Sequence, residues 1–117
     1  MTEAWPSELR LHESGTRLTI QFDDASTYDL AAEYLRVESP SAEVQGHSPS
    51  QKILQHGKKN VRIVNIVPVG NYAVRLDFDD GHNTGIFSWG YLAELGRDYD
   101  VKWGAYLKAL EAKGLSR

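Results

Sequence analysis

The chain of 117 residues has a formal net charge of −3, is 41% hydrophobic and contains no cysteine. This length predicts one domain, residues 1–117, with a single core, and the apolar content argues against disorder. The charge does not favour nucleic acid or an anionic membrane as a partner, and the lack of cysteine excludes disulfides, thiolate nucleophiles and cysteine-ligated metals. Apolar runs fall short of the roughly 18 residues of a membrane helix, and the first residues lack a signal-peptide pattern, so we expect a cytoplasmic protein.

The first third of the chain is predicted to form three strands and a helix. Residues 8–13 and 17–23 alternate apolar and polar side chains, as half-buried strands do, and the turn between them contains Gly15. Residues 27–30 return as a third strand. A helix is expected over residues 31–36, with Asp29 as a possible cap.

Residues 38–60 form an irregular middle segment rich in Ser, Pro, Gly and Gln. Loops of this length in compact domains tend to be functional or mobile. We expect residues 50–56 to form one or two helical turns that bury Ile53 and Leu54. Four basic side chains of this region could meet a phosphate or an acidic partner, although a solvated loop is the simpler interpretation. They are Lys52, Lys58, Lys59 and Arg62.

The second half is predicted to start with a long hairpin. Residues 61–69 are rich in β-branched side chains, so we place this strand at the centre of the sheet. Gly70 and Asn71 are expected to form a two-residue loop that leads to a strand over residues 72–79. An acidic turn over residues 79–83 then precedes a short returning strand.

Two helices are expected after this hairpin. Ser88 is the predicted N-cap of a short helix that ends at Gly96, and a final helix spans about residues 101–113 and closes at Gly114. The final helix has an apolar face at helical spacing. This face consists of Trp103, Tyr106, Leu107 and Leu110.

Residues 18–35, LTIQFDDASTYDLAAEYL, resemble residues 74–92, VRLDFDDGHNTGIFSWGYL. Each stretch has an alternating strand, Phe-Asp-Asp at the turn, a short return and a helical start with Tyr-Leu, and the second has one additional residue. We interpret them as two β-β-α units that pack with approximate two-fold symmetry; the alternative is that hairpins use such residues independently. The predicted fold class is α+β, with antiparallel β-hairpins in two similar β-β-α halves, short helices and a C-terminal helix.

His82 lies beside Asp80 at the tip of the second predicted hairpin. Such a cluster can hold a metal or carry acid–base chemistry, but solvated turn residues give the same pattern. The four histidines show no ligand spacing of a recognised metal site, and neither a nucleophile motif nor a phosphate-binding motif is present. Residue chemistry alone therefore does not identify a reaction.

Two segments carry a resemblance to a known family. LRVESPSAEVQGH at residues 35–47 and FDDGHNTGIFSWGYL at residues 78–92 resemble the small bacterial family related to the N-terminal domain of gamma-butyrobetaine hydroxylase, over about residues 6–95. In the full hydroxylases this domain precedes a catalytic domain that holds iron and uses 2-oxoglutarate. The resemblance covers only the first domain, so it does not imply hydroxylase activity. The same domain type is also found appended to Mrp/ApbC-like P-loop ATPases that carry iron–sulfur clusters.

The resemblance also bears on metal binding. The hydroxylase domain holds a structural zinc through three cysteines and one histidine; the histidine matches His82, and the cysteine positions correspond to Ser39, Ser41 and Val44. Serine hydroxyls and a valine cannot replace thiolates at a tetrahedral zinc site, so we expect no metal and no other cofactor. We expect instead that residues 39–44, which we call the serine segment, pack against the hairpin tip and hydrogen-bond to His82.

These observations predict a non-enzymatic interaction module with an unknown protein partner, as an accessory to iron–sulfur or iron-dependent protein assembly. The alternative is a small-ligand or metal-binding domain centred on His82, and a third hypothesis is an enzyme that the motifs do not reveal. We assign no catalytic residue, and we expect neither nucleic acid nor a membrane as a partner. The candidate binding residues are His82, Asp80, Ser39, Ser41 and His47.

Overall fold

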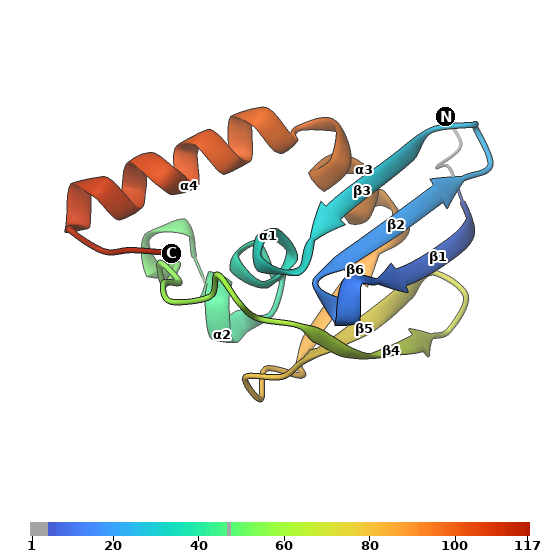
Figure 1. Ribbon diagram of the computed structural model, residues 1–117, viewed down its shortest axis with the longest axis horizontal. Helices are drawn as coiled ribbons and strands as arrows, with labels where there is room; N and C mark the ends of the chain where they lie inside the picture. Colours follow the sequence, from blue (N-terminus) through green and yellow to red (C-terminus); the bar gives the residue numbers. More distant parts are fainter. Residues whose placement is uncertain (1–4, 47) are drawn as a thin grey trace.

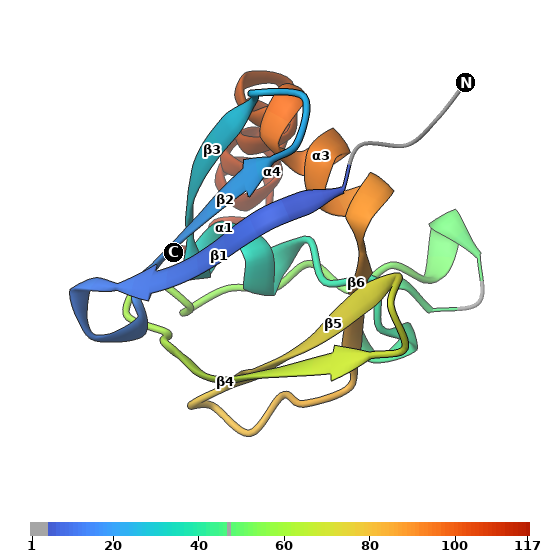
Figure 2. The same ribbon diagram turned by 90° about the vertical axis from the view of Figure 1, so that its right-hand side faces the viewer.

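Two antiparallel sheets of three strands each form the body of the computed structural model, which describes residues 5–46 and 48–117. The first sheet has the order β1 (Pro6–His12), β2 (Arg17–Phe22) and β3 (Thr27–Ala31), and the second has the order β4 (Ile63–Val69), β5 (Ala73–Phe78) and β6 (Gly85–Ser88). One sheet lies above the other in Figure 2. The predicted α+β class is confirmed.

The helices gather to one side of the two sheets (Figure 1). They are α1 (Ala32–Val37), α2 (Ala42–Gln45), α3 (Trp89–Arg97) and α4 (Tyr99–Lys113), with 3₁₀ turns η1 (Glu13–Gly15) and η2 (Pro49–Gln51). Among the described helices, none is both long and apolar enough to cross a membrane.

Both sheets and the first turns of α1 and α3 contribute to one apolar core, because the alternating side chains of β2 and β5 point into the same interior. The predicted inward residues of β2 and β5 are at most 3% exposed. They are Leu18, Ile20 and Phe22 on β2 and Val74, Leu76 and Phe78 on β5.

The turns of the two β-β-α halves have the same hydrogen bonds. The amide of Phe22 donates to the carbonyl of Ser26 at 2.8 Å, and the amide of Phe78 donates to the carbonyl of His82 at 2.9 Å. The similar stretches of sequence therefore form equivalent turns, and the additional residue of the second half follows His82.

The helices of the two halves also bind each other reciprocally. The hydroxyl of Tyr34 in α1 donates to the carbonyl of Leu95 at 2.7 Å, and the hydroxyl of Tyr91 in α3 donates to the carbonyl of Glu38 at 2.6 Å. In both cases the acceptor lies four residues beyond the tyrosine of the other half. This exchange is what an approximate two-fold axis between the halves produces.

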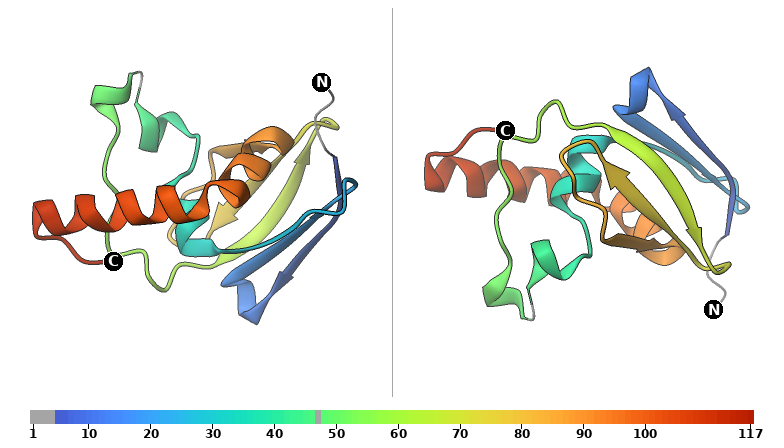
Figure 3. Two further views of the ribbon diagram at one scale, coloured as in Figure 1. Left: turned by 90° about the horizontal axis from the view of Figure 1, so that it is seen from above. Right: turned by 90° about the horizontal axis from the view of Figure 1, so that it is seen from below.

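A second, smaller apolar cluster fixes α4 to the rest of the molecule. Tyr106 and Leu110 of α4 pack against Val37 at the end of α1. The last residues return beside the middle segment (Figure 3), and the guanidinium of Arg117 donates to both carboxylate oxygens of the buried Glu33, at 2.7 and 3.0 Å. The predicted closure of α4 at Gly114 is confirmed by its left-handed conformation, φ 66°.

Two predictions about the second hairpin were wrong. β4 is an edge strand rather than a central one, and Val64 is 59% exposed. Pro68 lies within this strand and has no N–H to donate, which suits an edge. The loop after β4 also contains three residues rather than two, since Val69 pairs with Ala73.

The predicted end of α3 at Gly96 was wrong, because the helix continues to Arg97. A Cβ atom at Gly96 would lie 2.3 Å from Cγ of Tyr28. The glycine is thus required by the close approach of a ring from β3 rather than by a helix end. Asp29 does not cap α1 either: Ala31 is the N-cap, and the carboxylate of Asp29 accepts from Arg17 at 3.0 Å.

The middle segment and α4 differ from prediction in detail. Residues 50–56 contain no α-helical turn, and only η2 at their start is helical. Ile53, predicted to be buried, is 57% exposed, and Leu107, predicted on the apolar face of α4, is 40% exposed. Both side chains are on the outer surface, where they are available to a partner.

Candidate functional site

The serine segment after α1 packs against the tip of the β5–β6 hairpin. Ser41 is the N-cap of α2, where its hydroxyl accepts from the amide of Glu43 at 3.1 Å. The same hydroxyl lies 2.6 Å from that of Thr84 in the hairpin. The predicted contact between this segment and the hairpin tip is present, although Ser41 meets Thr84 rather than His82.

His82 is only 5% exposed, and both of its ring nitrogens are engaged by the serine segment. Nε2 lies 2.9 Å from Oγ of Ser39, and Nδ1 lies 2.9 Å from Oε2 of Glu43. A carboxylate can only accept, so Nδ1 carries the proton and Nε2 accepts from the Ser39 hydroxyl. Ser39 Oγ in turn accepts from the amide of Ser41 at 3.3 Å.

The surroundings of His82 favour this neutral ring. Burial lowers the pKa of His82 because it disfavours the charged imidazolium, and the nearby charge of Arg36 lowers it further. The carboxylates of Glu43 and Asp80 oppose this effect without reversing it. The histidine therefore acts as a neutral hydrogen-bonding link between loop and hairpin.

Asp80 holds the same turn together from the other side. One carboxylate oxygen accepts from the amide of His82 at 3.1 Å, and the other accepts from Nε of Arg36 at 2.9 Å and Nζ of Lys58 at 2.7 Å. Burial by itself would raise the pKa of Asp80, but the bonds from Lys58, the His82 amide and Arg36 outweigh it and lower the pKa to about 2. Nη1 of Arg36 is buried without a hydrogen-bond partner among the described residues.

Ser39, His82 and Glu43 have the connectivity of a serine nucleophile, its base and an orienting acid. The surroundings do not permit that chemistry, since Ser39 is 0% exposed. Gly85 lies directly against it: a Cβ atom at this glycine would be 2.5 Å from Oγ of Ser39. No substrate carbonyl can approach the hydroxyl, so the three residues form a structural link.

Of the remaining residues that the sequence placed at the site, the structure describes Val44 but not His47. Val44 is buried beside this network. Among residues 5–46 and 48–117, no group of three or more His, Asp or Glu side chains could hold a metal ion. The basic residues do not form one cluster, because Lys58 binds Asp80 while Lys52 lies 3.6 Å from Glu38.

Sequence reasoning missed Glu43, the partner of His82. The Ser-Ala-Glu sequence at residues 41–43 is typical of a helix start and was the available signal. A short helix there turns the carboxylate of Glu43 toward the hairpin.

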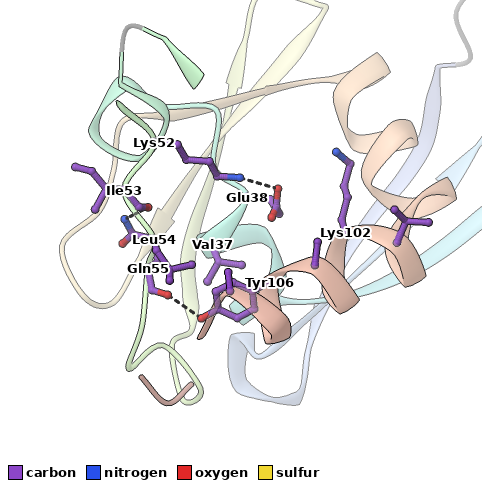
Figure 4. Close-up of a pocket in the computed structure, with 11 residues that line it drawn as sticks. Val37, Glu38, Lys52, Ile53, Leu54, Gln55, Lys102 and Tyr106 are labelled. Carbon is purple, nitrogen blue, oxygen red and sulfur yellow. Dashed lines mark hydrogen bonds and ion pairs between the residues drawn. The ribbon is translucent and has the colours of Figure 1, made fainter. Parts of the chain in front are cut away.

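Sequence reasoning also missed a cavity of about 380 Å³ on the opposite side of the middle segment. It lies between the end of α1, residues 52–55 and the face of α4 from Val101 to Ala109 (Figure 4). We call it the α4 groove. Its floor includes Tyr106, whose hydroxyl donates to the carbonyl of Gln55 at 2.9 Å, and this bond holds the two walls together.

Comparison with known proteins identifies the family. The family model described as gamma-butyrobetaine hydroxylase-like, N-terminal, matches residues 9–93. The chain belongs to this family. Among curated proteins, no significant match was found.

Solved structures of similar proteins have the same fold. Two NMR solution structures show 48% and 46% sequence identity and TM-scores of 0.84 and 0.83; the alignments cover 99% and 97% of this chain and 91% and 85% of those chains. A crystal structure of a DUF971-family protein of unknown function from Acidithiobacillus ferrooxidans shows 43% identity and a TM-score of 0.65, over 78% of this chain and 91% of that one. Neither the family description nor these neighbours indicate a catalytic activity.

Proposed function

We propose that this member of the gamma-butyrobetaine hydroxylase-like N-terminal family is a non-catalytic interaction module that binds a partner protein through the α4 groove. The observation that carries the proposal is the exposure of apolar side chains on both walls of this groove. Ile53 on the loop is 57% exposed, and Val101 on α4 is 76% exposed. Exposed apolar side chains along both walls of an open groove are typical of a surface that a partner covers.

The network around His82 supports a structural role for the second hairpin rather than a reaction there. Its hydroxyl, imidazole and carboxylate groups bind one another, and Ser39 and His82 are buried. This network fixes the start of the middle segment, from which residues 52–55 continue to the groove. The backbone of Ile53 is tied to it directly, since its amide donates to the carbonyl of Val44 at 2.7 Å.

We further propose that the partner belongs to iron–sulfur or iron-dependent protein assembly. The support is the resemblance to domains that are appended to iron–sulfur ATPases. A module of this kind would bring a partner to such an assembly without a catalytic group of its own.

Affinity capture from native cytosol tests both parts of the proposal. The bait is the tagged full chain, as wild type, as Val101→Glu and as Val64→Glu. Val64 is a matched control because it is an exposed valine on β4, away from the groove. We expect wild type and Val64→Glu to retain the same iron-dependent or iron–sulfur protein and Val101→Glu to lose it. Retention of that protein by Val101→Glu, or no reproducible partner for folded wild type, would refute the proposal.

A further inference from the structure

The α4 groove is long and open, which bears on the kind of molecule that fits it. Between Val101 and Ala109 it follows α4 for about 12 Å, at 1.5 Å per residue. A pocket for a small ligand usually buries roughly 70–90% of that ligand. Here the exposed Ile53 and Val101 leave both walls open to solvent, so a small molecule would stay largely uncovered. The geometry favours a segment of a macromolecule that covers the walls as well as the floor.

The apolar lining fits a helix better than an extended strand. On α4 it follows the spacing of Val101, Ala105 and Ala109, so the wall presents small side chains along two turns of the helix. A second helix can approach closely along such a row and insert its larger apolar side chains toward Leu54 and Tyr106.

The charged residues at the rim of the groove indicate the charge of the partner segment. Lys52 extends from the loop and Lys102 from α4, on facing sides of the groove (Figure 4). Their ammonium groups lie 3.6 Å from Glu38 and 3.2 Å from Glu94, so each makes one ion pair through a group that has three donors. Each can therefore donate to a further carboxylate of a partner. The residues that line the groove include these two lysines and one carboxylate, Glu38, so the charge of the lining favours an acidic segment over a basic one.

We infer that the occupant of the α4 groove is an acidic amphipathic helix of the partner protein. Its apolar face contacts Ile53, Leu54 and Tyr106, and its carboxylates bind Lys52 and Lys102. This inference rests on the proposed function and adds the chemistry of the partner segment. One wall of the groove, α4, lies outside the matched residues 9–93, so the site depends on a helix beyond the part of the chain that the family model covers.

Synthetic peptides test the inference with the full chain. The first probe is a capped 14-residue helix with leucines on one face and glutamates beside them; the second has lysine for every glutamate, and the third has serine for every leucine. Fluorescence anisotropy measures affinity, and ¹⁵N amide shifts locate the contact. Decanoate, a small carboxylate amphiphile, forms a fourth arm.

Two double variants show whether Lys52 and Lys102 make the groove prefer an acidic peptide to a basic one. Lys52→Glu with Lys102→Glu reverses both rim charges, and Lys59→Glu with Lys108→Glu makes the same change of net charge at exposed lysines outside the groove. We expect wild type and the control to bind the glutamate peptide about tenfold more tightly than the lysine peptide, as two exposed ion pairs allow. The rim variant should reverse this preference, and the amide shifts should centre on Ile53 and Ala105.

Each of the other possible results would refute a specific part of the inference. Equal binding of the glutamate and lysine peptides would refute the acidic partner while leaving the groove as an interaction surface. Tight binding of decanoate, with weak binding of every peptide, would refute a helical partner in favour of a small ligand. Failure of all four probes would refute the inference, and the capture experiment with Val101→Glu would then decide the proposed function separately.

Discussion

Gly96 provides a direct test of how the two halves pack. A methyl group there would point at the face of the Tyr28 ring, 2.3 Å from Cγ and 2.5 and 2.6 Å from the Cδ atoms. The ring cannot yield freely, because it also meets Phe22 edge-on with centroids 6.0 Å apart. Gly104 in α4 is a matched control: it too lies inside a helix, and in the described structure a Cβ atom there has no heavy atom within 4 Å.

Substitution by alanine should act in opposite directions at these two glycines. Alanine gains about 1 kcal/mol over glycine inside a helix, so Gly104→Ala should stabilise the protein by up to that amount. Gly96→Ala has the same gain, but overpacking against Tyr28 costs about 1–3 kcal/mol. The difference in unfolding free energy between the two variants should therefore be about 1–3 kcal/mol, with the helix propensity cancelled.

Urea unfolding followed by tryptophan fluorescence and far-ultraviolet circular dichroism measures both values. In a Tyr28→Ala background the clash is removed, so Gly96→Ala should become stabilising by about 1 kcal/mol. If Gly96→Ala stabilises the otherwise native chain as much as Gly104→Ala does, the packing of α3 on β3 is not as described.

Three further predictions concern the core and the turn. Phe78→Ala should destabilise by about 3–5 kcal/mol in urea unfolding, because it empties a core site that is 3% exposed; a loss below about 1 kcal/mol would contradict the core. Because the pKa of Asp80 is lowered in the folded protein, its contribution to the free energy of unfolding is complete above the unfolded pKa near 4. This contribution is lost as the pH falls toward about 2. That loss should reach about 2 kcal/mol in wild type and be absent from Asp80→Asn, whereas identical pH profiles would refute the ion-pair role. Calorimetric titration with Zn²⁺ or Fe²⁺ should show no heat that depends on His82, because both ring nitrogens are already bound; a metal-dependent heat that His82→Ala abolishes would overturn that view.

The sequence was most informative where a local pattern determines structure. Alternation located β2 and β5, and the Ser88 hydroxyl does accept from the amide of Tyr91, as a predicted N-cap should. The contact between the serine segment and His82 was also predicted, through the family resemblance. Each of these inferences depends on neighbours in the chain or on a comparison with another sequence.

The errors arose where a residue is determined by a partner distant in sequence. A glycine at position 96 is typical of a helix end, and only the position of Tyr28 shows that Gly96 allows close packing instead. The apolar run of β4 has the composition of a central strand, although Pro68 was a local sign of an edge. The α4 groove was not predictable at all, because its walls come from segments about 50 residues apart in the chain.

Comparison of the two β-β-α halves distinguishes two roles of His82, one in its own turn and one in holding the middle segment. In the first half the equivalent residue is Ser26, whose amide donates to Asp24 at 3.0 Å just as the amide of His82 donates to Asp80. The turn therefore forms without an imidazole. The His82 side chain is additional: it extends to Ser39 and Glu43 and holds the start of the middle segment.

The substitution His82→Ser, which introduces the residue of the first half, should loosen the loop and leave the turn. It removes both ring hydrogen bonds and leaves the Ser39 hydroxyl buried without its acceptor, a change worth about 1–3 kcal/mol. Amide hydrogen exchange should accelerate at Val44, whose amide donates to the carbonyl of Ser41, while Phe78, whose amide donates across the turn, stays protected. Ser39→Ala should resemble it at Val44, because it removes the other end of the same bond. Equal loss of protection at Phe78 would mean that His82 builds the turn itself, and unchanged exchange at Val44 would mean that the imidazole does not hold the loop.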